Sequence, residues 1–377
     1  MTTRNNAPEN VAATETPPPP PRRWWRGAVR VVVGVVVAAV LLWFLFRGTD
    51  WAELWRALAN ISWPWFLLAQ VAGWATYFTR AARWHRVALA VRPVAFRPVF
   101  SATQVGQLVN LAVIPRLGEL LRAVMLTRIS PLRFGEVLST AALDRVTDML
   151  ALLLFLLMSL AVFPLDTEIT LPGAILDRDA PLVIPTASLE PAILLLGAVV
   201  LGGLLTLVLL YVRRDWMLAV LRWGLRPFPA RFSHQVIEFF AHFADGMHVF
   251  RSWRGLAMTL YWALMTWGFT LLTVDLVFRA FELNHPWYAA IVATTLLSVF
   301  LMVNVTPGFV GQFHLAVIAG VLLTTPGTPP VKAKAVAIVS HVCALYPTVI
   351  LGVWALMRER IGLGQLLRRT REARGDN

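Results

Sequence analysis

Long blocks of apolar residues, separated by short polar and basic segments, make up most of the chain. About 20 consecutive apolar residues span the hydrocarbon core of a bilayer, and blocks of about that length recur throughout. The pattern therefore predicts membrane-spanning helices at residues 28–46, 63–80, 136–163, 191–212, 257–280 and 333–357.

Two other apolar stretches, residues 98–129 and 288–324, are each interrupted near the middle. In both, an asparagine is followed by a proline and then by a glycine next to Glu or Gln. Each stretch is therefore either a pair of short helices that enters the membrane and returns, or a pair of thin spans. The residues of the two breaks are Asn110, Pro115, Arg116, Gly118 and Glu119 in the first stretch and Asn304, Pro307, Gly308, Gly311 and Gln312 in the second.

The order of these segments is the same in both halves of the chain. Each half has three long segments and one broken pair, and a broken pair returns the chain to the side from which it started. The number of crossings per half is therefore odd, which inverts the second half relative to the first. The sequence predicts an all-α, polytopic integral membrane helix bundle at residues 28–360, built from two inverted repeats at 28–163 and 191–357.

Composition and charge support this interpretation. With 58% hydrophobic and 15% charged residues, the chain differs from an ordinary soluble domain. The net charge of +13 first suggests nucleic acid, but the arginines cluster between the apolar blocks, as they do where they fix membrane orientation. We therefore expect a multi-pass protein of the inner (plasma) membrane with both termini in the cytoplasm and no nucleic-acid partner. Because Cys343 is the only cysteine, an intrachain disulfide is excluded.

Three segments outside the predicted spans have distinct compositions. Residues 1–27 are rich in proline and end in a basic cluster, a composition typical of disorder. Residues 361–377 form a second basic tail. Apolar residues recur at helical spacing within residues 215–255, which predicts an amphipathic segment on the cytoplasmic membrane surface.

Ionisable residues inside the membrane cost free energy and usually mark a pathway or a paired site. The first half contains two such groups, which are Arg116, Glu119 and Arg122, and Asp144, Arg145 and Asp148. A helix that restarts inside the membrane presents unsatisfied N–H groups that favour an anion, and guanidinium groups bind phosphate through paired hydrogen bonds. We expect Arg116, Arg122 and the two helix restarts to bind a phosphate, with Asp144 and Asp148 neutralising the arginines when no ligand is bound.

Each of these groups also has a structural interpretation. The charges at residues 116–122 could reach the headgroups from an interfacial position, and Asp144 and Arg145 could form a pair between helices. Asn110, Asn304 and Gln312 could bind substrate or form hydrogen bonds between helices. The sequence contains no motif for an activated nucleophile, a phosphate loop or a metal site, and we expect no cofactor.

Three motifs resemble a known family. Residues 116–122 (RLGELLR), 142–148 (ALDRVTD) and 306–311 (TPGFVG) resemble the flippase-like membrane region of the lysylphosphatidylglycerol synthase family, which includes hopanoid-associated and archaeal relatives. The resemblance covers about residues 28–360 and implies movement of modified phospholipids or polyprenyl-linked lipids between leaflets. Full-length synthases continue into a soluble aminoacyl-transferase domain. Only residues 361–377 follow here, so we expect no lysyl transfer; Gln312 stands where the family often has Glu.

The leading hypothesis is a flippase-like carrier for an anionic phospholipid or polyprenyl-linked lipid, without enzymatic activity. Transport would be passive or coupled to an ion, with Glu119, Asp144 and Asp148 as proton sites. The expected partners are membrane lipids with anionic headgroups. One alternative is a membrane-embedded enzyme that modifies lipid headgroups, and another is a scaffold subunit for a membrane enzyme.

Overall fold

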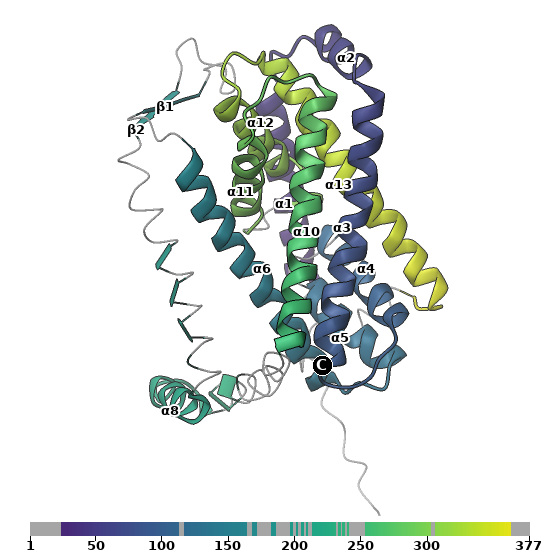
Figure 1. The fold of residues 1–377 in the computed structure, drawn as a ribbon, viewed down its shortest axis with the longest axis vertical. Coiled ribbons are helices and arrows are strands. Elements are labelled where there is room, and N and C mark those ends of the chain that lie inside the picture. Colours follow the sequence, from purple (N-terminus) through teal and green to yellow (C-terminus); the bar gives the residue numbers. More distant parts are fainter. Residues whose placement is uncertain are drawn as a thin grey trace, which may run out of the picture.

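The computed structural model describes residues 24–112, 117–163, 168–171, 182–185, 213–230, 253–302 and 306–362, with short pieces between 197 and 240. Most of the described chain is helical (Figure 1). The elements of the first half are α1 (Trp24–Phe46), α2 (Trp51–Ala59), α3 (Trp63–Leu89), α4 (Phe96–Ala112), α5 (Leu117–Ile129) and α6 (Phe134–Val162). The remaining elements are β1 (Glu168–Leu171), β2 (Leu182–Pro185), α8 (Arg214–Gly224), α10 (Trp253–Ala280), α11 (Ala289–Met302), η3 (Pro307–Phe309), α12 (Gln312–Thr324) and α13 (Pro330–Arg358).

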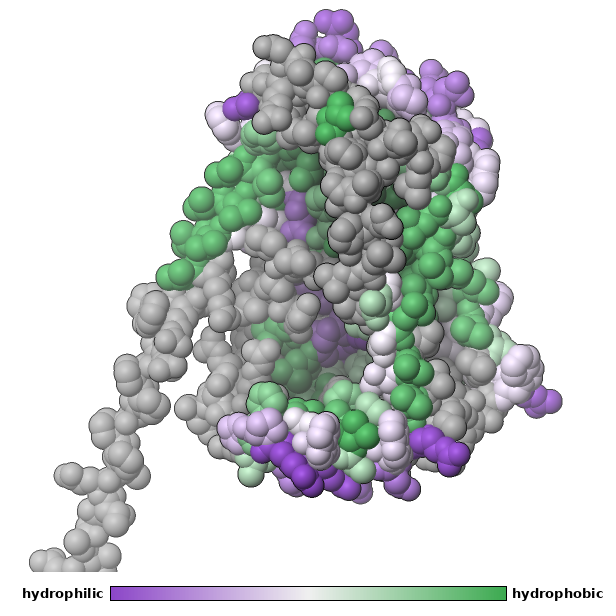
Figure 2. Space-filling model, turned by 90° about the vertical axis from the view of Figure 1, so that its left-hand side faces the viewer, coloured by the Kyte–Doolittle hydropathy of each residue, from purple (hydrophilic) through white to green (hydrophobic). Residues whose placement is uncertain are grey.

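Several helices are suited to a membrane. Within the described residues, four helical segments are long and apolar enough to cross it: α6, α10, α13 and the segment Pro307–Thr324 that contains α12. A fifth is added if α1 and α2, which meet at a bend of 91°, form one span. Apolar side chains cover the length of the bundle, and hydrophilic ones gather at its ends and in a hollow part-way along (Figure 2). The protein is therefore a multi-pass membrane protein.

Two of the predicted spans are not among these helices. The segment 63–80 lies in α3, which is 27 residues long and continues to Leu89. α3, which carries Arg80, Arg83 and Arg86, is not among the four helices that are long and apolar enough to cross a membrane. Most of the predicted span 191–212 lies outside the described residues, as does most of residues 231–250 in the predicted amphipathic segment. The longest described helix in that segment is α8, which lies at one end of the bundle (Figure 1).

Both predicted helix breaks are confirmed. The first broken stretch consists of α4 and α5, which pack against each other, and the second consists of α11 and α12, which also pack against each other. Figure 1 shows α4 and α5 towards the end of the bundle that carries α8, and α11 and α12 towards the end that carries α2, β1 and β2. The two pairs therefore approach the middle of the bundle from opposite ends.

Glycine allows close approach at each break. At the first, a Cβ on Gly118 would overlap the carbonyl oxygen of Gly106 on α4. The close contact between α4 and α5 therefore requires glycine at position 118. At the second, Gly311 has a φ of 85°, in the left-handed region. A Cβ there would lie 2.7 Å from Cβ of Leu41, because α1 packs against this break.

The two halves of the chain interleave within one bundle. The α10 helix lies along α3, and α13 crosses α4, so elements of the second half cover elements of the first. Polar side chains fix some of these contacts: the Tyr346 hydroxyl donates to Gln70 Oε1 at 2.6 Å, and Trp74 Nε1 donates to the Tyr346 hydroxyl at 2.9 Å. Between α6 and α11, the hydroxyls of Ser159 and Thr295 lie 2.8 Å apart. In the membrane such hydrogen bonds help to hold helices together.

β1 and β2 pair antiparallel and are the only strands in the part of the chain that the structure describes. They lie beside the far end of α6 (Figure 1). The all-α prediction did not include this short ladder, because an acidic loop with isolated apolar residues gives no clear alternation over four-residue strands.

Candidate functional site

Charged side chains from α3, α5 and α6 meet in the interior around Asp144. This residue is fully buried, and its two carboxylate oxygens are each bound by a different arginine. Oδ1 accepts from Arg83 Nε at 2.8 Å, and Oδ2 accepts from Arg122 Nη1 at 3.0 Å. Arg83 and Arg122 are themselves buried, so Asp144 joins three helices at one point.

The contacts continue to form a closed ring. Asp148 Oδ1 lies 2.7 Å from Arg83 Nη1, and its Oδ2 lies 3.1 Å from Arg145 Nη1. Glu119 Oε1 lies 2.7 Å from Arg145 Nη2, and its Oε2 lies 2.8 Å from Arg122 Nη2. We call this set the ion-pair ring, in which positive and negative charges alternate in the order Arg83, Asp144, Arg122, Glu119, Arg145 and Asp148.

Local helix geometry places these side chains. On α6, Thr140, Asp144 and Asp148 follow one another at intervals of four and share a face. Trp84 Nε1 donates to Thr140 Oγ1 at 3.2 Å, and the Trp84 ring lies 4.5 Å from the guanidinium carbon of Arg122. Trp84 thus holds α3 against α6 and supports Arg122 through a cation–π contact.

One side of the ring is buried and the other is partly exposed. The side chains of Arg83 and Asp144 are 0% exposed, whereas those of Glu119 and Arg145 are 27% and 35% exposed. Asp148 Oδ1 and Glu119 Oε2 accept no aligned hydrogen bond, although each touches an arginine. These two contacts are therefore electrostatic, without an aligned hydrogen bond. Arg145 Nε also has no hydrogen-bond partner.

Arg80 adds a positive charge that the ring does not neutralise. It lies one turn before Arg83 on α3, is half-buried, and interacts electrostatically with Asp144 and Asp148. Within the described residues it forms no hydrogen bond or ion pair. Four arginines thus meet three carboxylates, which leaves one positive charge in excess.

At the first helix restart, the asparagine caps a helix. Asn110 Oδ1 accepts the Gly118 N–H at 2.9 Å, and Asn110 Nδ2 lies 3.4 Å from Glu119 Oε1. One of the free N–H groups that we expected to face an anion is therefore already satisfied. Pro115 and Arg116, both expected at this site, lie outside the described residues.

The second break contains no comparable charges among the described residues. Gln312 is buried; its Nε2 donates to the Phe300 carbonyl at 2.5 Å, and its Oε1 accepts from Thr306 Oγ1 at 3.3 Å. His341 Nε2 donates to the Gly308 carbonyl at 2.9 Å. Gln312 thus ties α11 to α12 and lies on a different broken pair from the ion-pair ring, while Asn304 lies outside the described residues.

Sequence reasoning missed Arg80 and Arg83 as site residues. The predicted span ended at residue 80, whereas α3 continues to Leu89 and the side chain of Arg83 is 0% exposed. A usable signal was present, since Ala81, Ala82, Val87 and Ala88 continue the helix with residues small enough for close packing.

The ring and both breaks fall within one region of similarity to known proteins. A family described as "Lysylphosphatidylglycerol synthase TM region" matches residues 31–352. The chain belongs to this family. The match confirms the resemblance inferred from the motifs around Glu119, Asp144 and Gly308. No curated protein is similar enough to the chain to count as a match.

Proposed function

We propose that this member of the lysylphosphatidylglycerol synthase TM region family moves an anionic phospholipid or polyprenyl-linked lipid between leaflets, in a flippase-like manner. The observation that carries the proposal is the excess positive charge beside the ion-pair ring. A charge within a membrane protein is costly unless it is paired or serves a function. The phosphate of a lipid headgroup is the anion that a membrane supplies in quantity.

Phosphate binding would exchange one ion pair for another. Arg80 offers a guanidinium group without a partner among the described residues, and Arg145 is the most exposed arginine of the ring. A phosphate that bridges these two arginines would compete with Glu119 and Asp148. Each of these carboxylates has one oxygen that contacts an arginine without an aligned hydrogen bond. A carboxylate released in this way can accept a proton, so Glu119 and Asp148 are the groups through which we propose that transport is coupled to protons.

The ring also provides a neutral resting state. Removing one partner of a buried ion pair leaves an uncompensated charge, at a cost of about 3–5 kcal/mol. Because each ring arginine touches two carboxylates, Arg83 and Arg122 stay neutralised while Arg145 changes partner. The buried side would hold the helices, and the exposed side would bind and release lipid.

We further propose that the two broken pairs belong to inverted repeats, with both termini in the cytoplasm of the cell and the end of α4 and α5 facing it. Support comes from the opposite positions of the two pairs in the bundle (Figure 1) and from the positive-inside distribution of arginine. Because α3 lies along α10 and α4 packs against α13, the lipid would cross between interleaved halves rather than between two separate domains.

Leaflet exchange in proteoliposomes tests the proposal. The purified protein should accelerate the exchange of a fluorescent phosphatidylglycerol relative to protein-free liposomes, and mass spectrometry should recover that lipid unchanged. Recovery of a chemically altered headgroup would instead support an embedded enzyme. Exchange no faster than in protein-free liposomes, with the lipid intact, would contradict transport and favour a scaffold.

A further inference from the structure

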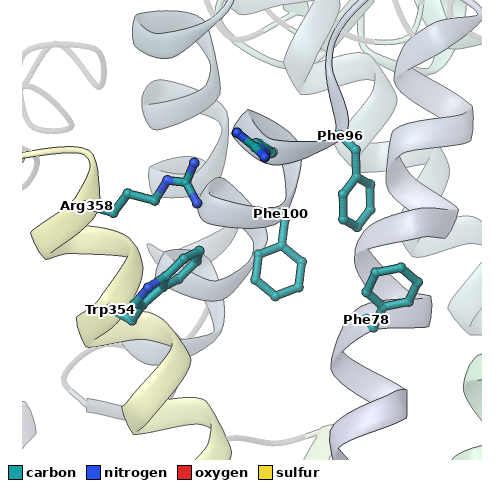
Figure 3. A pocket seen from close by; sticks show the side chains of 6 residues that line it. Phe78, Phe96, Phe100, Trp354 and Arg358 are labelled. Atoms are coloured by element: carbon teal, nitrogen blue, oxygen red, sulfur yellow. The ribbon is translucent and has the colours of Figure 1, made fainter.

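A pocket of about 270 Å³ lies between α3, α4 and α13, apart from the ion-pair ring. Figure 3 shows its aromatic side chains converging from these three helices, with Arg358 extending from α13 above Trp354 towards α4. The residues that line it are Phe78, Phe96, Arg97, Phe100, Trp354 and Arg358. None of them belongs to the ring, so this pocket is a separate feature.

Its wall is a continuous row of aromatic rings. Centroids of Phe78 and Phe96 lie 5.2 Å apart, those of Phe96 and Phe100 5.8 Å, and those of Phe100 and Trp354 6.0 Å. The outer members are open to the surroundings, since Phe78 is 51% and Trp354 is 42% exposed. In a membrane-spanning bundle, an exposed aromatic wall contacts lipid and not water.

Two arginines complete the pocket at the end of the bundle where α4 begins and α13 ends. Arg358 lies over the Trp354 ring at 5.1 Å, and its contact with Glu359 is long, at 3.9 Å. That same Glu359 oxygen accepts a 2.8 Å hydrogen bond from Ser101. Arg97 is exposed and forms no hydrogen bond or ion pair within the described residues.

We infer that this pocket binds an anionic phospholipid, whose phosphate bridges Arg97 and Arg358 and whose upper acyl chain lies along the aromatic row. Guanidinium groups bind phosphate through paired hydrogen bonds, and aromatic rings beside a charged rim match the amphipathic region just below a lipid headgroup. The volume is slightly below the roughly 300–1,000 Å³ of pockets that enclose a whole small molecule. The pocket therefore holds the part of the lipid next to its phosphate and leaves the rest in the bilayer.

This site does not depend on leaflet exchange, because a bound lipid can stabilise the bundle whether or not the protein transports lipid. The pocket lies where α4 begins and α13 ends, so it would bind lipid from the leaflet at that end of the bundle. The contact with α13 also joins the first and second halves of the chain, so the bound lipid would bridge them.

Native mass spectrometry of the full chain in detergent tests the site, with phosphatidylglycerol and phosphatidylcholine of identical acyl chains as probes. Because the ion-pair ring is itself proposed to bind an anionic lipid, binding to the pocket is measured on an Arg80→Gln background, in which the protein should retain one phosphatidylglycerol in preference to phosphatidylcholine. The double variant Arg97→Gln/Arg358→Gln should lose at least about tenfold in affinity for phosphatidylglycerol, because each hydrogen-bonded charge pair contributes about a factor of ten or more. An unchanged preference in this variant would overturn the inference.

Arg279→Gln is the matched control. Arg279 also lies over an exposed tryptophan, Trp65, at 5.6 Å, but it is paired with Asp275 at the opposite end of the bundle. An equal loss of binding in this variant would indicate general attraction of interfacial charge and contradict the site. Trp354→Leu retains both arginines and should weaken binding of both lipids; if it has no effect while glycerol phosphate competes fully, the pocket is an anion site and not a lipid site.

Discussion

At the first helix break, α5 restarts beside six alternating charges, whereas at the second, α12 restarts among amide, imidazole and aromatic groups. Both breaks use glycine for close approach and both place a polar side chain at the restart. The shared features concern the path of the backbone, and the differences concern charge. The comparison shows that the helix break is a shared feature of the backbone in both halves. Within the described residues, only the break in the first half lies beside a cluster of charged side chains.

The largest effect should come from Asp144→Asn. This change leaves Arg83 and Arg122 buried with one carboxylate partner each, and should lower the free energy of unfolding in detergent by about 3–5 kcal/mol. At the second break, Gln312→Leu removes uncharged hydrogen bonds and should cost only about 1 kcal/mol. Equal costs in denaturant unfolding would show that the charges contribute no more to folding than the amide does.

Glycine substitutions should affect the two breaks alike. Gly118→Ala forces α5 away from α4, and Gly311→Ala strains a left-handed residue against Leu41, so each should cost about 1–3 kcal/mol. Gly135→Ala on α6 meets open space and should change stability by no more than about 0.5 kcal/mol. A response at only one break would refute their shared architecture.

The exposed side of the ring should matter least for stability. Glu119 is 27% exposed, so Glu119→Gln should cost about 1 kcal/mol or less, and the cost should shrink further in high salt. Thermal unfolding at two salt concentrations measures this. A loss as large as that of Asp144→Asn would mean that the ring has no exposed side that can change partners.

Much of this plan could be predicted from the sequence, for identifiable reasons. A proline followed closely by a glycine interrupts each of the two apolar stretches, so both breaks were predicted at the places where α4 and α11 end. The spacing of Asp144 and Asp148 placed them on one helical face. Arg83 was not predicted as a site residue, because hydropathy cannot distinguish a buried, paired arginine from an interfacial one until its partners on α6 are known.

The interleaving of the halves also could not be predicted. A repeat pattern fixes the order of segments within each half, but the pairing of α3 with α10 depends on side-chain contacts between halves that are far apart in the chain. Likewise, the cap that Asn110 forms on α5 requires the three-dimensional position of Gly118, whereas sequence shows only that an amide precedes a break.

The central claim is that the excess charge at Arg80 selects an anionic lipid. The direct measurement is the ratio of exchange rates for fluorescent phosphatidylglycerol and phosphatidylcholine in proteoliposomes, for wild type, Arg80→Gln and Arg86→Gln, an exposed arginine further along α3. We expect the wild type and Arg86→Gln to favour phosphatidylglycerol and Arg80→Gln to lose most of that preference. A preference that survives unchanged in Arg80→Gln would contradict the claim.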